Sequence, residues 1–133
     1  MRTGLLRTLG AATAAYGLAT AYRPSLLARP TGLVDADRRT EPHTALALRP
    51  LAWRDAASGL AMLLAPRGPA LVTATAVRIA SDLGDAYLLG TALPSRPRRL
   101  ATAVMASGWA ALAVAGLVGN CHAGKPAAQE ADA

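Results

Sequence analysis

The chain has 133 residues, which is enough for one domain. Hydrophobic residues make up 53% of it and charged residues only 17%. The net charge is +6, but the arginines lie in short segments between apolar stretches, so no basic face for nucleic acid is expected. A single cysteine, Cys121, excludes an intrachain disulfide and a multi-cysteine metal site.

The first apolar stretch predicts a helix over residues 4–22. Residues 8–22 carry no charge, and Arg7 can reach back to a membrane interface. Arg2 and Arg7, followed by an apolar run and the A-T-A sequence at 19–21, are also features of a cleaved secretory signal peptide. Both alternatives stay open, and the low leucine content favours a retained helix.

Residues 23–45 predict a polar, exposed loop. Pro24, Pro30 and Pro42 are spaced too closely for a long helix. Within the loop, residues 25–28 have the pattern of one short amphipathic turn at a membrane surface. The segment is therefore expected to be a connector.

Two further helices are predicted over 46–65 and 70–93. The P-R-G-P sequence at 66–69 is a strong turn signal, and a connection this short joins antiparallel helices. The two helices are therefore expected to form a hairpin.

The last helix is predicted over 98–119, followed by a disordered tail over 122–133. Its core, residues 100–119, contains 20 residues without a charge, the length needed to cross about 30 Å of hydrocarbon. Together the four helices predict an all-α, four-helix transmembrane bundle, with the lipid bilayer as its surroundings and a multi-pass location in the cell membrane.

The third helix carries three central charges, Arg78, Asp82 and Asp85. Inserting them into lipid is unfavourable by roughly 9 kcal/mol, whereas inserting the aliphatic residues of the same helix is favourable by about 4 kcal/mol. This helix can therefore lie in a membrane only when its charges are paired with groups on another helix.

Arg54 and Asp55 on the second helix are the expected partners. The charges at 78, 82 and 85 follow the i, i+4, i+7 spacing of one helix face, and a hairpin turning near Arg67 brings residues 54 and 55 to the same depth. Five ionisable residues are thus predicted to form one polar cluster: Arg54, Asp55, Arg78, Asp82 and Asp85. It is either a clasp between helices or a proton or ion relay. Asp85 is expected to be the carboxylate without an arginine.

The distribution of positive charge predicts the orientation. In the four-helix arrangement, one side holds eight arginines outside the cluster: Arg23, Arg29, Arg38, Arg39, Arg49, Arg96, Arg98 and Arg99. The other side holds Arg2, Arg7, Arg67 and Lys125. The positive-inside rule then predicts that the loops 23–45 and 94–99 are cytoplasmic.

Small residues predict where helices pack closely. Gly10, Ala14, Gly17 and Ala21 form a row on the first helix, and the last helix has a similar row: Ala103, Ser107, Ala111, Ala115 and Gly119. Such faces permit association with a second copy or with another membrane protein.

Motifs for common catalytic sites are not found, so no catalytic residue, metal or cofactor is predicted. His43 and His122 have no ligand partner at metal-binding spacing. The D-x-x-D at 82–85 is similar to the start of the metal-binding motif in membrane CDP-alcohol phosphotransferases. The second aspartate pair of that motif is missing, so the two metals of that chemistry cannot be held.

Another resemblance covers residues 45–93. Its motifs are R-P-L-A-W-R-D at 49–55, S-G-L at 58–60, A-P at 65–66 and an R-x-x-x-D-x-x-D stripe at 78–85. These resemble a group of small, uncharacterised four-helix bacterial membrane proteins with an Arg-Asp pair on the second helix. The resemblance implies the membrane-bundle fold and brings no activity with it.

Three functions are consistent with these patterns. The first is a non-enzymatic membrane protein, structural or interacting, whose cluster fastens the bundle. The second is a small transporter or proton-relay protein that uses Asp85. The third is a soluble helical protein whose charged stripe faces water, which leaves the uncharged residues 100–119 unexplained.

Overall fold

The computed structural model describes residues 1–119, and within them the chain is all-helical. The helices are α1 (Thr3–Tyr22), α2 (Ser25–Thr31), α3 (Pro42–Leu64), α4 (Pro69–Ala92) and α5 (Arg96–Val118). The predicted all-α class is confirmed. The tail predicted over 122–133 lies outside the described residues.

Three of the long helices begin with a proline in their first turn. Pro42, Pro69 and Pro97 occupy N1 or N2 of α3, α4 and α5. A backbone N–H at these positions has no partner within the helix, so a proline there costs nothing and its φ is already helical. For this reason α3 begins at residue 42, before the predicted start at 46.

The predicted polar loop over 23–45 contains a short helix, because the turn expected at 25–28 extends to residue 31 and forms α2. Pro30 is tolerated in its last turn. Gly32, with φ 77°, then ends the helix, and the Leu33 N–H donates to the Ala28 carbonyl at 2.8 Å. A helix this short gains its stability from tertiary packing, so the sequence pattern indicated only the single amphipathic turn at 25–28. Its buried residues, Ala28 and Thr31, provide that packing.

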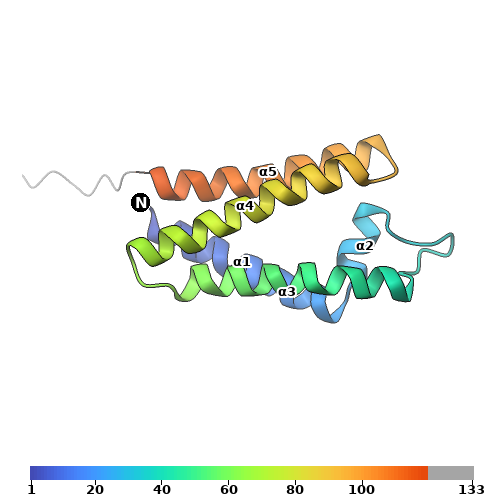
Figure 1. The fold of residues 1–133 in the computed structure, drawn as a ribbon, viewed down its shortest axis with the longest axis horizontal. Coiled ribbons are helices and arrows are strands. Elements are labelled where there is room, and N and C mark those ends of the chain that lie inside the picture. The colour runs from blue at the N-terminus through green and yellow to red at the C-terminus, as the bar shows by residue number, and fades with distance from the viewer. Residues whose placement is uncertain (120–133) are drawn as a thin grey trace, which may run out of the picture.

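The long helices form two pairs (Figure 1). α1 packs along α3, and α4 packs along α5, while α3 and α4 are joined by the predicted tight turn. The pairs lie close at the end that holds the N-terminus. Toward the other end they separate, and α2 lies between them, in contact with α1, α3 and α5.

The predicted small-residue row on α1 is an interface within the chain. Gly10, Ala14, Gly17 and Ala21 are all buried. A Cβ on Gly17 would lie 2.4 Å from the Ala56 nitrogen, so the backbones of α1 and α3 are in direct contact there.

The row on α5 points the other way. Ser107, Ala111 and Ala115 are exposed, and the buried residues of α5 are Ala110, Ala113 and Gly116. Ser107, Ala111 and Ala115 therefore lie on the outer side of the α4–α5 pair, whereas the two ends of the row, Ala103 and Gly119, are half-buried.

The hydrophobic core lies at the end where the two pairs are close. Leu6 and Leu9 of α1 meet Met62 of α3, Leu71 of α4 and Ala113 of α5 there. Each long helix thus contributes to one core, which holds the pairs together at this end.

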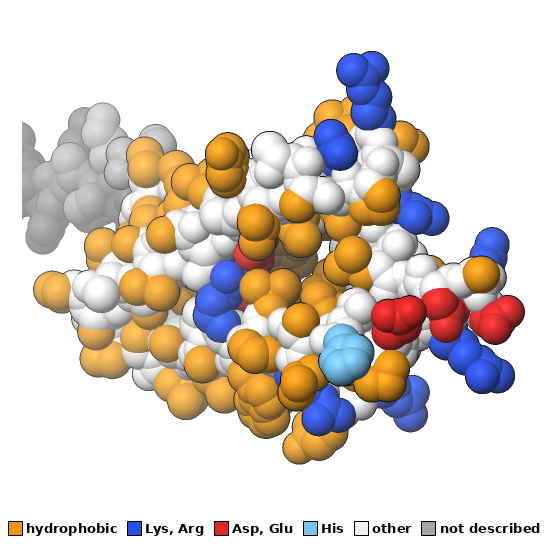
Figure 2. All heavy atoms as spheres, turned by 45° about the vertical axis from the view of Figure 1, so that its right-hand side comes forward, with side chains coloured by type: hydrophobic (Ala, Val, Ile, Leu, Met, Phe, Trp, Pro, Cys, Tyr) orange, Lys and Arg blue, Asp and Glu red, His pale blue; other side chains and the backbone are white. Residues whose placement is uncertain are grey.

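Large apolar side chains cover much of the outer surface, whereas many charged side chains gather at one end (Figure 2). Within residues 1–119, α5 is the one helix that is long and apolar enough by itself to be a candidate membrane span, and 22% of its most apolar stretch is buried.

The backbone contact at Gly17 is testable. Gly17→Ala should destabilise the protein by about 1–3 kcal/mol, because the added methyl group overpacks the α1–α3 interface. Gly108→Ala is the matched control, since a Cβ there meets nothing within 4 Å. It should be neutral or stabilising through better helix propensity. Thermal unfolding of both variants checks this, and equal effects would contradict direct contact between α1 and α3.

Candidate functional site

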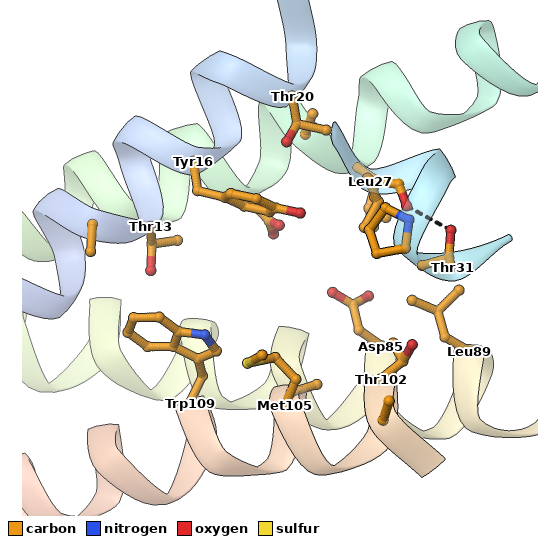
Figure 3. A pocket seen from close by; sticks show the side chains of 17 residues that line it. Thr13, Tyr16, Thr20, Leu27, Thr31, Asp85, Leu89, Thr102, Met105 and Trp109 are labelled. Atoms are coloured by element: carbon orange, nitrogen blue, oxygen red, sulfur yellow. Dashed lines mark hydrogen bonds between the residues drawn. The ribbon is translucent and has the colours of Figure 1, made fainter. Parts of the chain in front are cut away.

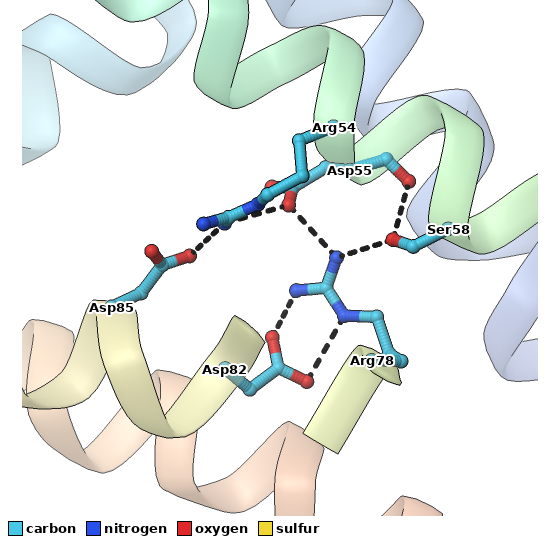
Figure 4. Close-up of polar contacts among 6 residues, drawn as sticks. All are labelled: Arg54, Asp55, Ser58, Arg78, Asp82 and Asp85. Atoms are coloured by element: carbon cyan, nitrogen blue, oxygen red, sulfur yellow. Dashed lines mark hydrogen bonds and ion pairs between the residues drawn. The ribbon is translucent and has the colours of Figure 1, made fainter. Parts of the chain in front are cut away.

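The candidate site is the polar cluster between α3 and α4, and the structure brings together all five predicted residues (Figure 4). Arg54 and Asp55 come from α3, and Arg78, Asp82 and Asp85 come from α4. The turn at 65–68 sets the register of the two helices, so these side chains meet at one level, as the hairpin argument predicts.

Arg78 is the centre of the cluster. Its Nη1 donates to Asp55 Oδ1 at 2.9 Å and to Ser58 Oγ at 3.3 Å, across the gap between the helices. On its own helix, Nε donates to Asp82 Oδ2 at 3.1 Å and Nη2 donates to Asp82 Oδ1. The two-pronged contact with Asp82 is the strong geometry for an arginine and a carboxylate.

Arg54 forms the second half of the cluster. Its Nη2 donates to Asp85 Oδ2 at 2.6 Å, which crosses from α3 to α4, and to Asp55 Oδ1 at 3.0 Å. The Arg54 side chain is 38% exposed, whereas that of Arg78 is 9% exposed. The Arg78 half is therefore the more strongly shielded from the surroundings.

Asp55 joins the two halves, because its Oδ1 accepts hydrogen bonds from both arginines. This corrects the expectation that Asp85 has no arginine, since Asp85 pairs with Arg54. The negative charge in excess is shared, with three carboxylates distributed over two guanidinium groups. The spacing of the charges along the two helices does not show that one carboxylate is shared by both arginines, so the sequence argument missed this arrangement.

Ser58 is a member of the cluster that charge counting did not find. Its hydroxyl accepts from Arg78 and donates to the Asp55 carbonyl at 3.2 Å. Its position at i+3 from Asp55 on a helix places both on one face, and this spacing is a signal that could have identified it.

The chemistry available to this site is limited. Each carboxylate accepts a hydrogen bond from a guanidinium group, an arrangement that suits helix-to-helix fastening. Within residues 1–119, no three His, Cys, Asp or Glu side chains are arranged to hold a metal ion. The ion pairs of the cluster therefore hold α3 and α4 together.

Comparison with known proteins does not assign the chain to a family. No protein-family model matches the chain, and no curated protein or solved structure gives a match. The function is therefore inferred from the fold and from the cluster itself.

Replacing Arg78 should lower the free energy of unfolding. Arg78→Gln leaves Asp82 and Asp55 buried with an incomplete set of partners, and breaking a buried ion pair costs about 3–5 kcal/mol. Arg49→Gln is the control, since Arg49 is exposed on α3 and its loss should change the free energy of unfolding by about 0.5 kcal/mol or less. Chemical unfolding in detergent measures both. Similar stability of the two variants would mean that the cluster does not fasten the helices.

Proposed function

We propose that this chain is a small integral membrane protein, a four-helix transmembrane bundle in which the Arg/Asp cluster fastens α3 to α4 inside the membrane. The role is structural or interacting, with no catalytic step. The resemblance of residues 45–93 to small four-helix bacterial membrane proteins belongs to the same proposal.

The observation that carries this proposal is the inverted polarity of α4. This helix buries Arg78 and Asp82, with 8% and 3% of their surfaces exposed, and directs Val77, Leu83 and Leu88 outward. In water this arrangement is unfavourable, because buried charges lose their hydration and exposed apolar side chains are not removed from water. In lipid the same arrangement is favourable, since polar groups turn inward and pair with one another.

The position of the arginines supports a defined orientation. The segment 23–41 and the beginning of α5 lie at the same end of the bundle (Figure 1), and together they carry seven of the eleven arginines outside the cluster: Arg23, Arg29, Arg38, Arg39, Arg96, Arg98 and Arg99. Under the positive-inside rule this end is cytoplasmic.

The pairing of the carboxylates favours fastening over a relay. Asp55, Asp82 and Asp85 each accept a hydrogen bond from an arginine, and the contacts of Asp55 with Arg78 and of Asp85 with Arg54 cross between α3 and α4.

The exposed row at Ser107, Ala111 and Ala115 extends the proposal to partners. Small residues on an outward face let another helix approach closely in a bilayer. We therefore include self-association, or association with another membrane protein, through this face of α5.

Fractionation tests the membrane location. After lysis and a sodium carbonate wash, the protein should remain in the membrane pellet and should leave it only with detergent, because the apolar outer surface requires lipid or a substitute. Recovery in the soluble fraction without detergent would contradict the proposal and favour a soluble helical protein.

Cysteine labelling tests the orientation. In a Cys121→Ser background, Ala36→Cys reports on the segment 23–41 and Arg67→Cys reports on the α3–α4 turn at the opposite end. In intact cells an impermeant maleimide should label position 67 and leave position 36 unlabelled until the cells are permeabilised. The reverse pattern would overturn the orientation, and it is also the pattern expected if residues 1–21 are cleaved as a signal peptide.

A further inference from the structure

A cavity of about 490 Å³ lies between the α1–α3 pair and the α4–α5 pair (Figure 3). Residues of α2, among them Leu27 and Thr31, form part of its wall at the end where the pairs separate. The volume is that of a pocket for a small organic molecule, which typically measures about 300–1,000 Å³.

The wall of this cavity is mostly apolar and has aromatic rings on two helices. Tyr16 of α1 and Trp109 of α5 both point into the cavity, and Met105 lies beside Trp109 (Figure 3). Rings in such positions can pack against the apolar part of a ligand, and their π faces attract a positive charge.

The charged groups of the wall have one sign. Asp55 and Asp85 line the cavity, and no Lys, Arg or His is among its lining residues. Asp85 bonds to Arg54 through Oδ2, and Asp55 bonds to both arginines through Oδ1. Within residues 1–119 the other oxygen of each carboxylate accepts no hydrogen bond. The excess negative charge of the cluster is therefore directed at the cavity.

Thr20 supplies an independent sign that the cavity receives a polar ligand. The residue is 1% exposed, and its Oγ1 has no hydrogen-bond partner within the described residues. The hydroxyl points into the cavity (Figure 3). A buried hydroxyl without a partner is costly, and a ligand with an N–H or O–H group would satisfy it.

We propose that this cavity binds a small organic cation: a protonated amine that carries an apolar, preferably aromatic, body. The ammonium group pairs with the free oxygen of Asp85, and the body lies between Tyr16 and Trp109. The Thr20 hydroxyl provides a second polar contact. This binding function goes beyond the fastening role of the cluster and uses the carboxylate oxygens that fastening leaves unoccupied.

The test uses the full chain, purified in detergent, with Trp53→Phe so that Trp109 is the sole tryptophan. The probe is 4-phenylbutylamine, which is protonated at neutral pH. Its neutral and anionic analogues of similar size are 4-phenylbutan-1-ol and 4-phenylbutanoate. Binding is followed as the change in Trp109 fluorescence. The amine should bind at least tenfold more tightly than the alcohol, and the butanoate should give no saturable change.

Variants separate the contribution of the Asp85 charge to binding from that of the cavity space. Asp85→Asn should lower the affinity for the amine at least tenfold and leave the affinity for the alcohol unchanged. Asp37→Asn is the control, because Asp37 is an exposed carboxylate on the segment 32–41, and it should change neither affinity. Ala106→Leu fills the cavity and should abolish the saturable signal of both molecules, which distinguishes binding from partition into the micelle.

Thr20→Val keeps the test decisive if Asp85→Asn does not fold. This variant should lower the affinity for the amine severalfold, because a polar contact is lost. Its melting temperature should stay the same or rise, because an unpartnered buried hydroxyl is removed. Equal affinity for amine and alcohol, insensitive to Asp85→Asn or Thr20→Val, would overturn the proposal and make the cavity a site for an uncharged chain such as a lipid tail. Absence of a saturable signal from the amine would overturn it as well.

Discussion

The buried guanidinium group of Arg78 is the constraint on which the arrangement of α3 and α4 depends. A charge with 8% of its residue surface exposed must be matched by carboxylates at hydrogen-bonding distance. Asp82 is available on the same helix, but Asp55 and Ser58 belong to α3. Satisfying Arg78 therefore sets the relative rotation of the two helices, whose register is set by the turn at 65–68.

The two halves of the molecule achieve cohesion by different means. Near the N-terminus, a core of Leu6, Leu9, Met62, Leu71 and Ala113 holds all four long helices together. Farther along, glycines bring α1 against α3 so closely that backbone atoms touch, while the α4–α5 pair turns away. The polar cluster spans α3 and α4 where apolar packing between the pairs ends, and the cavity opens beside it.

The surplus of one carboxylate connects fastening with binding. Two guanidinium groups are enough to hold the helices, yet three aspartates surround them, and Asp55 is shared between both arginines. The arginine contacts use one oxygen each of Asp55 and Asp85 and leave the other toward a cavity without a basic residue in its wall. Fastening and the proposed recognition of a cation are therefore compatible in one set of side chains.

The sequence by itself determined the helical class, the approximate bounds of the four long helices and the meeting of the five charged residues. These follow from periodicity, turn signals and the cost of an unpaired charge, which are local or depend on one short hairpin. The tertiary structure decided what depends on distant segments. It formed α2 by packing Ala28 and Thr31, made the α1 row an internal interface, and gave Asp85 its arginine. It also formed the cavity, because Tyr16, Thr20 and Trp109 converge only when α1 and α5 face each other across the bundle. No pattern within one helix specifies that meeting.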